Sequence, residues 1–170
     1  MFLCNSFAIR VITICFLLFC VAVSSSWARL GETKEQIEGR YGHSSVIPPY
    51  EQRMFHDSAD WHHLRYSKDK YNIDVTFHGE VSVSESYSSP NDDFAPEQIQ
   101  QLLSINSQGH QWKQTIFSSQ PEWDRDDGAL AREFIMGATK SFLIQTKEDV
   151  DHWSEVRAAE KKKSDNMDGF

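Results

Sequence analysis

The chain has 170 residues, of which 17 are basic and 25 acidic, giving a formal net charge of −8. This length suits one domain or two small fused halves, and a 12% share of aromatic residues argues against disorder. An acidic protein repels phosphate backbones, so we expect no nucleic-acid partner. The one basic run, Lys161–Lys163, lies close to acidic residues and is interpreted as a solvated tail.

Residues 1–28 have the organisation of a cleavable signal peptide. A segment with a single positive charge, Arg10, precedes an apolar run of 13 residues, Val11–Val23. The run fits the roughly 7 to 15 residues of a signal-peptide core and is shorter than the about 20 that span a bilayer. Ser26 and Ala28 place small residues at positions −3 and −1 of a cleavage site. We expect cleavage after Ala28, export to the periplasm or extracellular space, and no membrane span afterwards; an uncleaved anchor is the alternative.

All cysteines of the chain lie in this segment, at Cys4, Cys15 and Cys20. After cleavage the protein therefore cannot form a disulfide, a cysteine nucleophile or a thiolate metal site. Lipidation signals have a small residue directly before the cysteine, whereas Phe19 precedes Cys20, so we expect release rather than lipid tethering. Because Arg10 is the only charged residue of the segment, the remaining chain carries a formal charge of −9.

Residues 29–87 are predicted to form a short helix followed by three strands. Thr33 and Gln36 match a capping box, and Gly42 suits the left-handed end of a helix, so a helix is expected over 33–41. Apolar and polar residues then alternate as in a hairpin with one buried face. The three strands are expected at 61–66, 71–77 and 81–87.

Residues 88–95 are expected to be a linker, and 96–147 to repeat this order of elements. Pro96 suits the first turn of a helix with an apolar stripe of leucine and isoleucine. Three strands are expected at 112–117, 129–136 and 141–146, with a polar loop over 118–127. Residues 148–170 are predicted to be a charged C-terminal helix and tail.

The two halves share a short sequence match. Glu35–Ile37 recurs as Glu97–Ile99, 62 residues later. This indicates either a tandem structural repeat or a chance match. In both cases we expect an α+β fold, with two short-helix-plus-three-strand units whose antiparallel sheet carries its helices on one face.

Residues 30–42 resemble the opening of the SmpA/OmlA family of small envelope proteins. The shared pattern is a glycine before a Thr or Ser helix cap, an apolar helix residue and a closing glycine. In this chain the four features are Gly31, Thr33, Ile37 and Gly42. The resemblance implies a short helical segment on an antiparallel sheet, as in the β-lactamase inhibitor proteins, where the unit occurs in tandem. It also implies a protein-binding role in the cell envelope. The family usually has a proline where Ser44 stands.

The segment His56–His63 offers candidates for metal chemistry, because imidazole and carboxylate groups bind zinc. The candidate ligands are Asp57, Asp60, His62 and His63. If 61–66 is a strand, His62 and His63 point to opposite faces and cannot share a metal. No HExxH motif is present. We therefore interpret the segment as a polar strand edge and loop, and expect neither a metal nor a cofactor.

Other reactive motifs are weaker still. Asp124, Asp126 and Asp127 precede Gly128, but the twelfth position counted from Asp124, where an EF-hand has its bidentate acid, is Ile135. A tight turn is the preferred interpretation. The chain has neither a G-x-S-x-G nucleophile motif nor a glycine-rich phosphate loop. No catalytic residue is assigned.

Aromatic residues supply the candidate binding residues, since they often dominate interface affinity, although core packing is their commoner use. The candidates are Trp61, Trp112 and Trp123, with Trp123 placed on the polar loop. We expect a non-catalytic exported module that binds or scaffolds a protein partner in the envelope or extracellular space. The alternative is a small exported hydrolase, with or without a metal, that uses His56–His63. Neither the partner nor an oligomeric state follows from the sequence.

Overall fold

The computed structural model describes residues 29–45, 47, 60–90, 93–116, 118, 120–136 and 139–167. The predicted signal peptide, its cleavage site and the three cysteines lie outside these residues, as do His56 and Asp57. Among the described helices, none combines the length and apolar character needed to cross a membrane.

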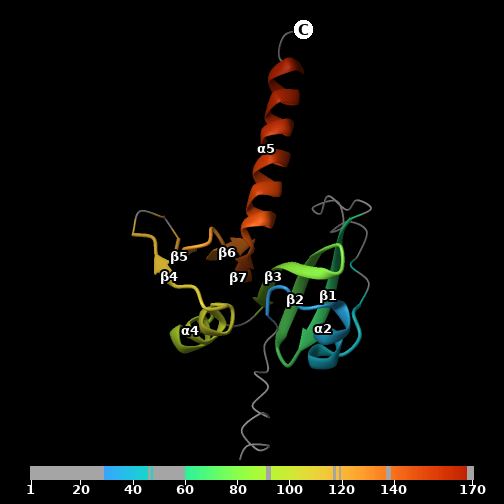
Figure 1. The fold of residues 1–170 in the computed structure, drawn as a ribbon, viewed down its shortest axis with the longest axis vertical. Helices are drawn as coiled ribbons and strands as arrows, with labels where there is room; N and C mark the ends of the chain where they lie inside the picture. Colours follow the sequence, from blue (N-terminus) through green and yellow to red (C-terminus); the bar gives the residue numbers. More distant parts are fainter. Residues whose placement is uncertain are drawn as a thin grey trace, which may run out of the picture.

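Seven strands form one antiparallel sheet in the order β1-β2-β3-β7-β6-β5-β4 (Figure 1). The strands are β1 (Trp61–Lys68), β2 (Tyr71–His78), β3 (Val81–Ser89), β4 (Trp112–Gln114), β5 (Glu122–Arg125), β6 (Leu130–Met136) and β7 (Thr139–Gln145). The helices are α2 (Lys34–Tyr41), α4 (Pro96–Ile105) and α5 (Lys147–Met167). Two meanders, β1 to β3 and β4 to β7, join where β3 pairs with β7. The predicted α+β class and antiparallel sheet are confirmed.

Strand β5 was not expected, because 118–127 was predicted to be a polar loop. That prediction is wrong, and the second half has four strands instead of three. β5 is short and buries an arginine, Arg125, which is 4% exposed. Arg125 donates two hydrogen bonds of 2.7 Å to Asp127 and lies 5.3 Å from the ring centroid of Trp112. A strand with a buried cation has no apolar alternation for a sequence pattern to detect.

Helices α2 and α4 pack on the same face of the sheet, which we call the helix face. The Thr33 hydroxyl accepts a hydrogen bond from the Gln36 N–H, and the Gln36 side chain accepts one of 2.8 Å from the Thr33 N–H, as the capping box predicts. Buried side chains from both helices join strand residues in one cluster. Its helix members are Ile37, Tyr41, Ile99, Leu102 and Leu103, and its strand members include Tyr66, Val75, Phe77 and Phe142.

The helix face also buries an acid. Glu85 is fully buried and accepts a hydrogen bond from the Tyr87 hydroxyl. Burial raises the pKa of Glu85 to about 7, against an ordinary value of 4.5. The core of the first half therefore contains a carboxyl group that titrates near neutral pH.

The segment before α2 ties the two halves together on the helix face. The Leu30 N–H donates a 2.9 Å hydrogen bond to the side-chain oxygen of Asn106, which is fully buried after α4. The Gln108 side chain in turn donates a 2.6 Å hydrogen bond to the Leu30 carbonyl. Gly31 and Ser82 continue the contact to β3 through a 2.7 Å backbone hydrogen bond.

Helix α5 contacts β3 and β7 on the opposite face, and rises above the sheet while α2 and α4 lie below it (Figure 1). The expectation that the helices share one face therefore holds for α2 and α4 and is wrong for α5. The first turn of α5 buries Asp149, whose carboxylate accepts a hydrogen bond from the Gln145 side chain. Burial raises the pKa of Asp149 to about 6. From Arg157 to Asp165 the helix is exposed.

Candidate binding surface

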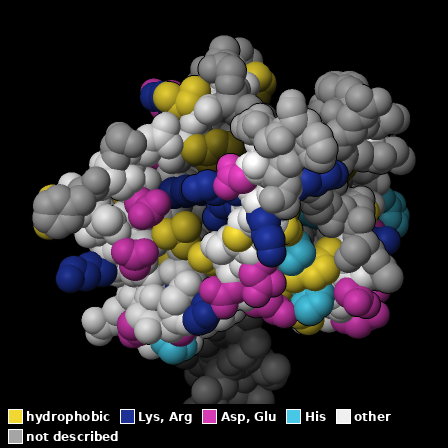
Figure 2. Space-filling view, turned by 90° about the horizontal axis from the view of Figure 1, so that it is seen from above, with side chains coloured by type: hydrophobic (Ala, Val, Ile, Leu, Met, Phe, Trp, Pro, Cys, Tyr) yellow, Lys and Arg dark blue, Asp and Glu magenta, His cyan; other side chains and the backbone are white. Residues whose placement is uncertain are grey.

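Side chains between α5 and the strands surround a polar hollow of about 260 Å³. Alternate residues of β1, β2, β3, β6 and β7 point to this side because successive strand residues face opposite ways. The lining residues are His63, Asp74, Thr76, Ser84, Ser86, Arg132, Phe134, Leu143, Gln145, Trp153 and Arg157. Figure 2, viewed from the α5 side, shows basic, acidic and histidine side chains among hydrophobic ones on this face.

The lining of the polar hollow carries a surplus of positive charge, because two arginines, Arg132 and Arg157, face one buried acid, Asp149, which is hydrogen-bonded to the lining residues Gln145, Trp153 and Ser84. Asp74, the one acid among the described lining residues, accepts two hydrogen bonds, of 2.6 and 2.9 Å, from Arg65 on β1 and is neutralised by that residue. Arg132 has a buried Nε without a hydrogen-bond partner among the described residues. Arg157 donates a 3.4 Å hydrogen bond to the Ser154 hydroxyl on its own helix. Desolvating a cation without an acceptor is costly, so the hollow favours an incoming anionic group.

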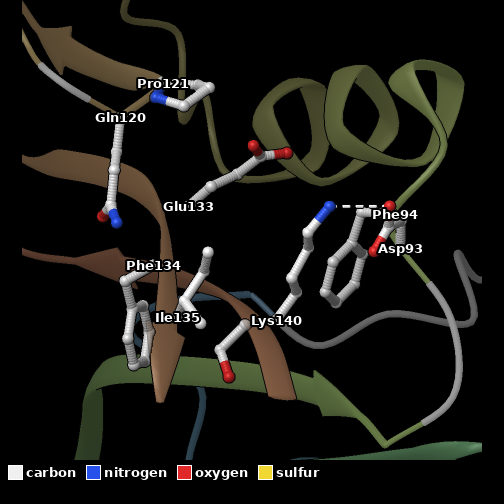
Figure 3. Close-up of a pocket in the computed structure, with 9 residues that line it drawn as sticks. Asp93, Phe94, Gln120, Pro121, Glu133, Phe134, Ile135 and Lys140 are labelled. Atoms are coloured by element: carbon white, nitrogen blue, oxygen red, sulfur yellow. Dashed lines mark hydrogen bonds and ion pairs between the residues drawn. The ribbon is translucent and has the colours of Figure 1, made fainter. Parts of the chain in front are cut away.

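A second cavity, the edge pocket, lies beside the β6–β7 hairpin and has a volume of about 370 Å³. Its lining residues are Asp93, Phe94, Gln120, Pro121, Glu133, Phe134, Ile135, Lys140 and Ser141. Figure 3 shows Glu133 and Lys140 pointing toward α4 while Phe134 points to the other side of the hairpin. Phe134 also lines the polar hollow, so the two cavities adjoin.

The charges of the edge pocket are unequally paired. Lys140 Nζ lies 2.6 Å from Asp93 Oδ2 in an ion pair (Figure 3). The half-buried Glu133 carboxylate accepts no hydrogen bond from any side chain or backbone group in the described part of the chain. Burial raises the pKa of Glu133, and the smaller effects of Lys140 and Asp93 act in opposite directions. One negative charge of the pocket is therefore left uncompensated.

Trp61, a predicted binding residue, lies in an aromatic stack at the base of α5. Its ring is 4.5 Å from that of His78 and 3.9 Å from that of His152, with interplanar angles of 18° and 12°. His78 Nδ1 is 2.6 Å from Glu148 Oε1. The stack fastens α5 to the β1–β2 edge, so Trp61 has a structural task in this fold.

Trp112 and Trp123 also have structural contacts. Trp112 is half-buried and donates a 2.8 Å hydrogen bond from Nε1 to the Leu103 carbonyl. Trp123 is 8% exposed and meets Phe142 edge-on at 5.8 Å. Its expected position on a polar loop is wrong, because β5 carries it into the core. Arg132 and Glu133 were not identified from the sequence. Their only signal in the sequence is that two charged residues stand next to each other within an otherwise apolar strand.

The histidine segment does not converge where the structure describes it. His62 is exposed, and its ring stacks on that of Phe77 on the helix face with 5.4 Å between the ring centroids. His63 instead lines the polar hollow. The prediction that these two residues point to opposite faces is confirmed. Asp60 is exposed, and its carbonyl accepts a 2.8 Å hydrogen bond from the Gly79 N–H. Asp57 lies outside the described residues.

His110, Asp126 and Asp127 place potential ligand atoms within 4.8 Å of one another on the surface. These groups already have partners, since His110 Nδ1 is 2.5 Å from Asp126 and Asp127 is bound by Arg125. Hydrogen bonds from Arg125 lower the pKa of Asp127 to about 2. Gly128 has a φ of 91°, and its N–H donates to the Arg125 carbonyl at 2.8 Å, so the predicted tight turn is confirmed.

The chain matches no protein-family model, no curated protein and no solved structure. The resemblance to the SmpA/OmlA family remains a prediction. Function has to be inferred from the two cavities and their charges.

Proposed function

We propose that the protein is an exported, non-catalytic module that binds a protein partner at the polar hollow. The observation that carries this proposal is Arg132, a half-buried cation on a central strand whose Nε has no acceptor among the described residues. A carboxylate supplied by a partner would satisfy that nitrogen in a partly desolvated site, where charge-assisted hydrogen bonds are strong. The carboxylate would also face Arg157 and the hydroxyl of Ser86.

A protein is the favoured partner because the hollow belongs to a larger surface. It adjoins the edge pocket through Phe134, and Trp153 and Arg157 border it from α5. Tryptophan and arginine are enriched among the residues that dominate protein interfaces, where a few central side chains supply most of the affinity. The hollow is built on five paired strands, so its side chains are already held in place before a partner binds, which lowers the entropic cost of binding.

Hydrolysis, the alternative function, has less support. His62 and His63 lie on opposite faces of the sheet, so they cannot act on one substrate or hold one metal. A hydrolase needs a base and a nucleophile or metal that converge on one point. Among the described residues of His56–His63, no such convergence is seen.

Two further features belong to this proposal. Export is supported by the organisation of residues 1–28. A tandem origin of the two halves is supported by Gln98, which accepts a 2.9 Å hydrogen bond from the Ala95 N–H just as Gln36 does from Thr33, 62 residues earlier. The isoleucine that follows each glutamine is buried.

A site-specific crosslinking experiment tests the binding proposal. A photoreactive amino acid at Ser86 in the hollow should crosslink a discrete partner from an envelope or extracellular extract of the source cells. The same group at Gln101, exposed on α4, should not. R132Q should reduce the Ser86 product by about tenfold or more, because the partner's carboxylate loses its counter-charge.

The matched control is K113Q, which removes one exposed positive charge from β4 and should leave the crosslinked product unchanged. Repeated failure to capture a partner, or equal capture from Ser86 and Gln101, would contradict the proposal.

A further inference from the structure

Glu133 is an uncommon residue for the position it occupies. It lies on β6 between Arg132 and Phe134, is half-buried, and points into the edge pocket (Figure 3). A carboxylate in such a place is normally paired or hydrogen-bonded, because desolvation penalises its charge. Glu133 has neither kind of partner among the described residues. The missing counter-charge points to a cationic ligand.

Lys140, the one cation among the described lining residues, does not fill this role. Lys140 on β7 pairs with Ile135 on β6, and its ammonium group donates a 2.6 Å hydrogen bond to the Asp93 carboxylate. The Lys140–Asp93 pair is neutral overall, so the pocket keeps the charge of Glu133. An incoming cation would therefore meet a net attraction at the centre of the cavity.

The walls of the edge pocket suit a long aliphatic side chain with a charged end. Phe94 is held in place by ring contacts with Tyr71 at 5.5 Å and Phe142 at 6.1 Å. Ile135 is 58% exposed at the pocket mouth, and Pro121 borders it. Lysine and arginine bury their methylene stems on apolar surfaces, and aromatic faces attract their charged heads. The volume of about 370 Å³ is ample for one such side chain.

The edge of β6 explains how a partner segment could reach the pocket. The Glu133 N–H donates a 2.9 Å hydrogen bond to the Pro121 carbonyl, but proline has no N–H to donate in return. The paired part of β5 ends at Glu122, so Ile135 extends beyond it. Among the described residues, no pairing with β5 is seen beyond Glu133, so an extended partner segment could add along this side of β6, as in β-strand addition.

We propose that the edge pocket binds the lysine or arginine side chain of an extended segment of the partner protein, with its charged end at Glu133. This inference rests on the proposed function, since it names the side chain that the partner presents next to the polar hollow. The partner segment would then carry an acidic residue for Arg132 and a basic residue for Glu133. Because Arg132 and Glu133 are consecutive on β6 and face opposite sides, the segment has to cross the edge at Phe134.

Selection of random peptides displayed on phage tests this inference on the chain after signal cleavage. Selected peptides should share a lysine or arginine at one position and an aspartate or glutamate at another. Selection on E133Q should lose the basic preference and keep the acidic one, and selection on R132Q should do the reverse. E97Q, which neutralises an exposed acid on α4, is the matched control and should change neither preference.

A synthetic peptide from the selection then allows a direct affinity measurement by titration calorimetry. Replacing its basic residue with norleucine, which keeps the stem and removes the charge, should weaken binding at least about tenfold to the native chain. The same replacement should have no effect on binding to E133Q, and this double comparison isolates the contact from any folding defect of the variant.

The outcomes separate the two proposals. Peptides that need Arg132 but show no basic preference, or a norleucine peptide that binds as tightly, would overturn the inference and leave the polar hollow standing. Peptides that need Glu133 and ignore Arg132 would overturn the hollow. Failure to select any peptide would count against both.

Discussion

The two faces of the sheet use the same strands for different purposes. On β7, Phe142 and Ile144 are fully buried on the helix face, whereas Leu143 between them is half-buried in the polar hollow. On β2, Val75 is fully buried while Asp74 pairs with an arginine on the α5 side. The helix face is closed by α2 and α4 and holds the core, while the α5 face stays polar and only partly covered. We infer that stability resides mainly on one face and recognition on the other.

Each face nevertheless buries one acid, and the two acids differ in their surroundings. Glu85 lies among apolar and tyrosine side chains of the helix face, with the Tyr87 hydroxyl as its donor. Asp149 lies in the first turn of α5, where a Gln145 side chain donates to it and its N–H donates to the Thr146 hydroxyl at 3.3 Å. Asp149 therefore contributes to the hydrogen bonding of the first turn of α5, whereas Glu85 is a polar residue within a hydrophobic core.

The largest expected effect comes from neighbouring truncations on β7. F142A should lower the free energy of unfolding by about 3 to 5 kcal/mol, because it leaves a cavity against Trp123 and Phe94. L143A, on the opposite face, should cost only about 1 kcal/mol, since part of its surface is already exposed. Urea unfolding followed by tryptophan fluorescence measures both. If both variants lost the same unfolding free energy, the α5 face would contribute to stability as much as the core on the helix face does.

Much of the helix face could be predicted from local pattern. The alternation in β2 and β3 indicates their pairing, and the capping residues of α2 mark its start, because each signal lies within a few residues. β5 could not be predicted in this way. Its four residues are held by pairing with β4 and β6, and its buried Arg125 is stabilised by Asp127 and Asn106, contacts that depend on the folded chain.

The candidate site was less accessible to sequence reasoning. Arg132 and Glu133 are visible as charges in a strand, but only the assembled sheet shows that they lack hydrogen-bond partners among the described residues. Phe94 reaches the edge pocket from the segment before α4 and lies beside Lys140, which is 46 residues later in the sequence (Figure 3). Trp123 shows the opposite error, because the unpredicted strand β5 carries this residue from its expected polar loop into the core.

Glu85 provides the second prediction, which concerns pH. Its folded pKa of about 7 exceeds the ordinary 4.5, so between these values the folded state binds more protons than the unfolded state. Its contribution to stability is thus complete below about pH 4.5 and lost as pH rises through 7. The effect is on the order of 3 kcal/mol between pH 5 and pH 8. The groups that set it are Tyr87, Glu32 and Arg40.

E85Q tests this dependence, because an amide replaces the carboxyl group without a charge at any pH. The variant should be more stable than the native chain at pH 8 and should flatten the pH profile of thermal unfolding. Asp149, whose pKa is also raised, should leave a smaller slope of the same sign. A native chain that gains stability from pH 5 to pH 8 would show that Glu85 is not buried as described.

The smallest expected change in stability comes from the two charges of the proposed binding surface. Arg132 and Glu133 lie next to each other on β6, one on each face, and neither side chain has a hydrogen-bond partner among the described residues that its removal would leave unsatisfied. R132Q and E133Q should therefore change the free energy of unfolding by about 1 kcal/mol or less, with stabilisation as the expected sign. Urea unfolding at neutral pH measures this, with K113Q as the reference for an exposed charge. If both variants lost as much unfolding free energy as F142A, both charges would be needed for the fold. The proposed division into a stabilising face and a binding face would then be wrong for β6. If the unfolding free energy instead changes little or rises while partner capture is lost, these two adjacent residues serve binding and are not needed for folding.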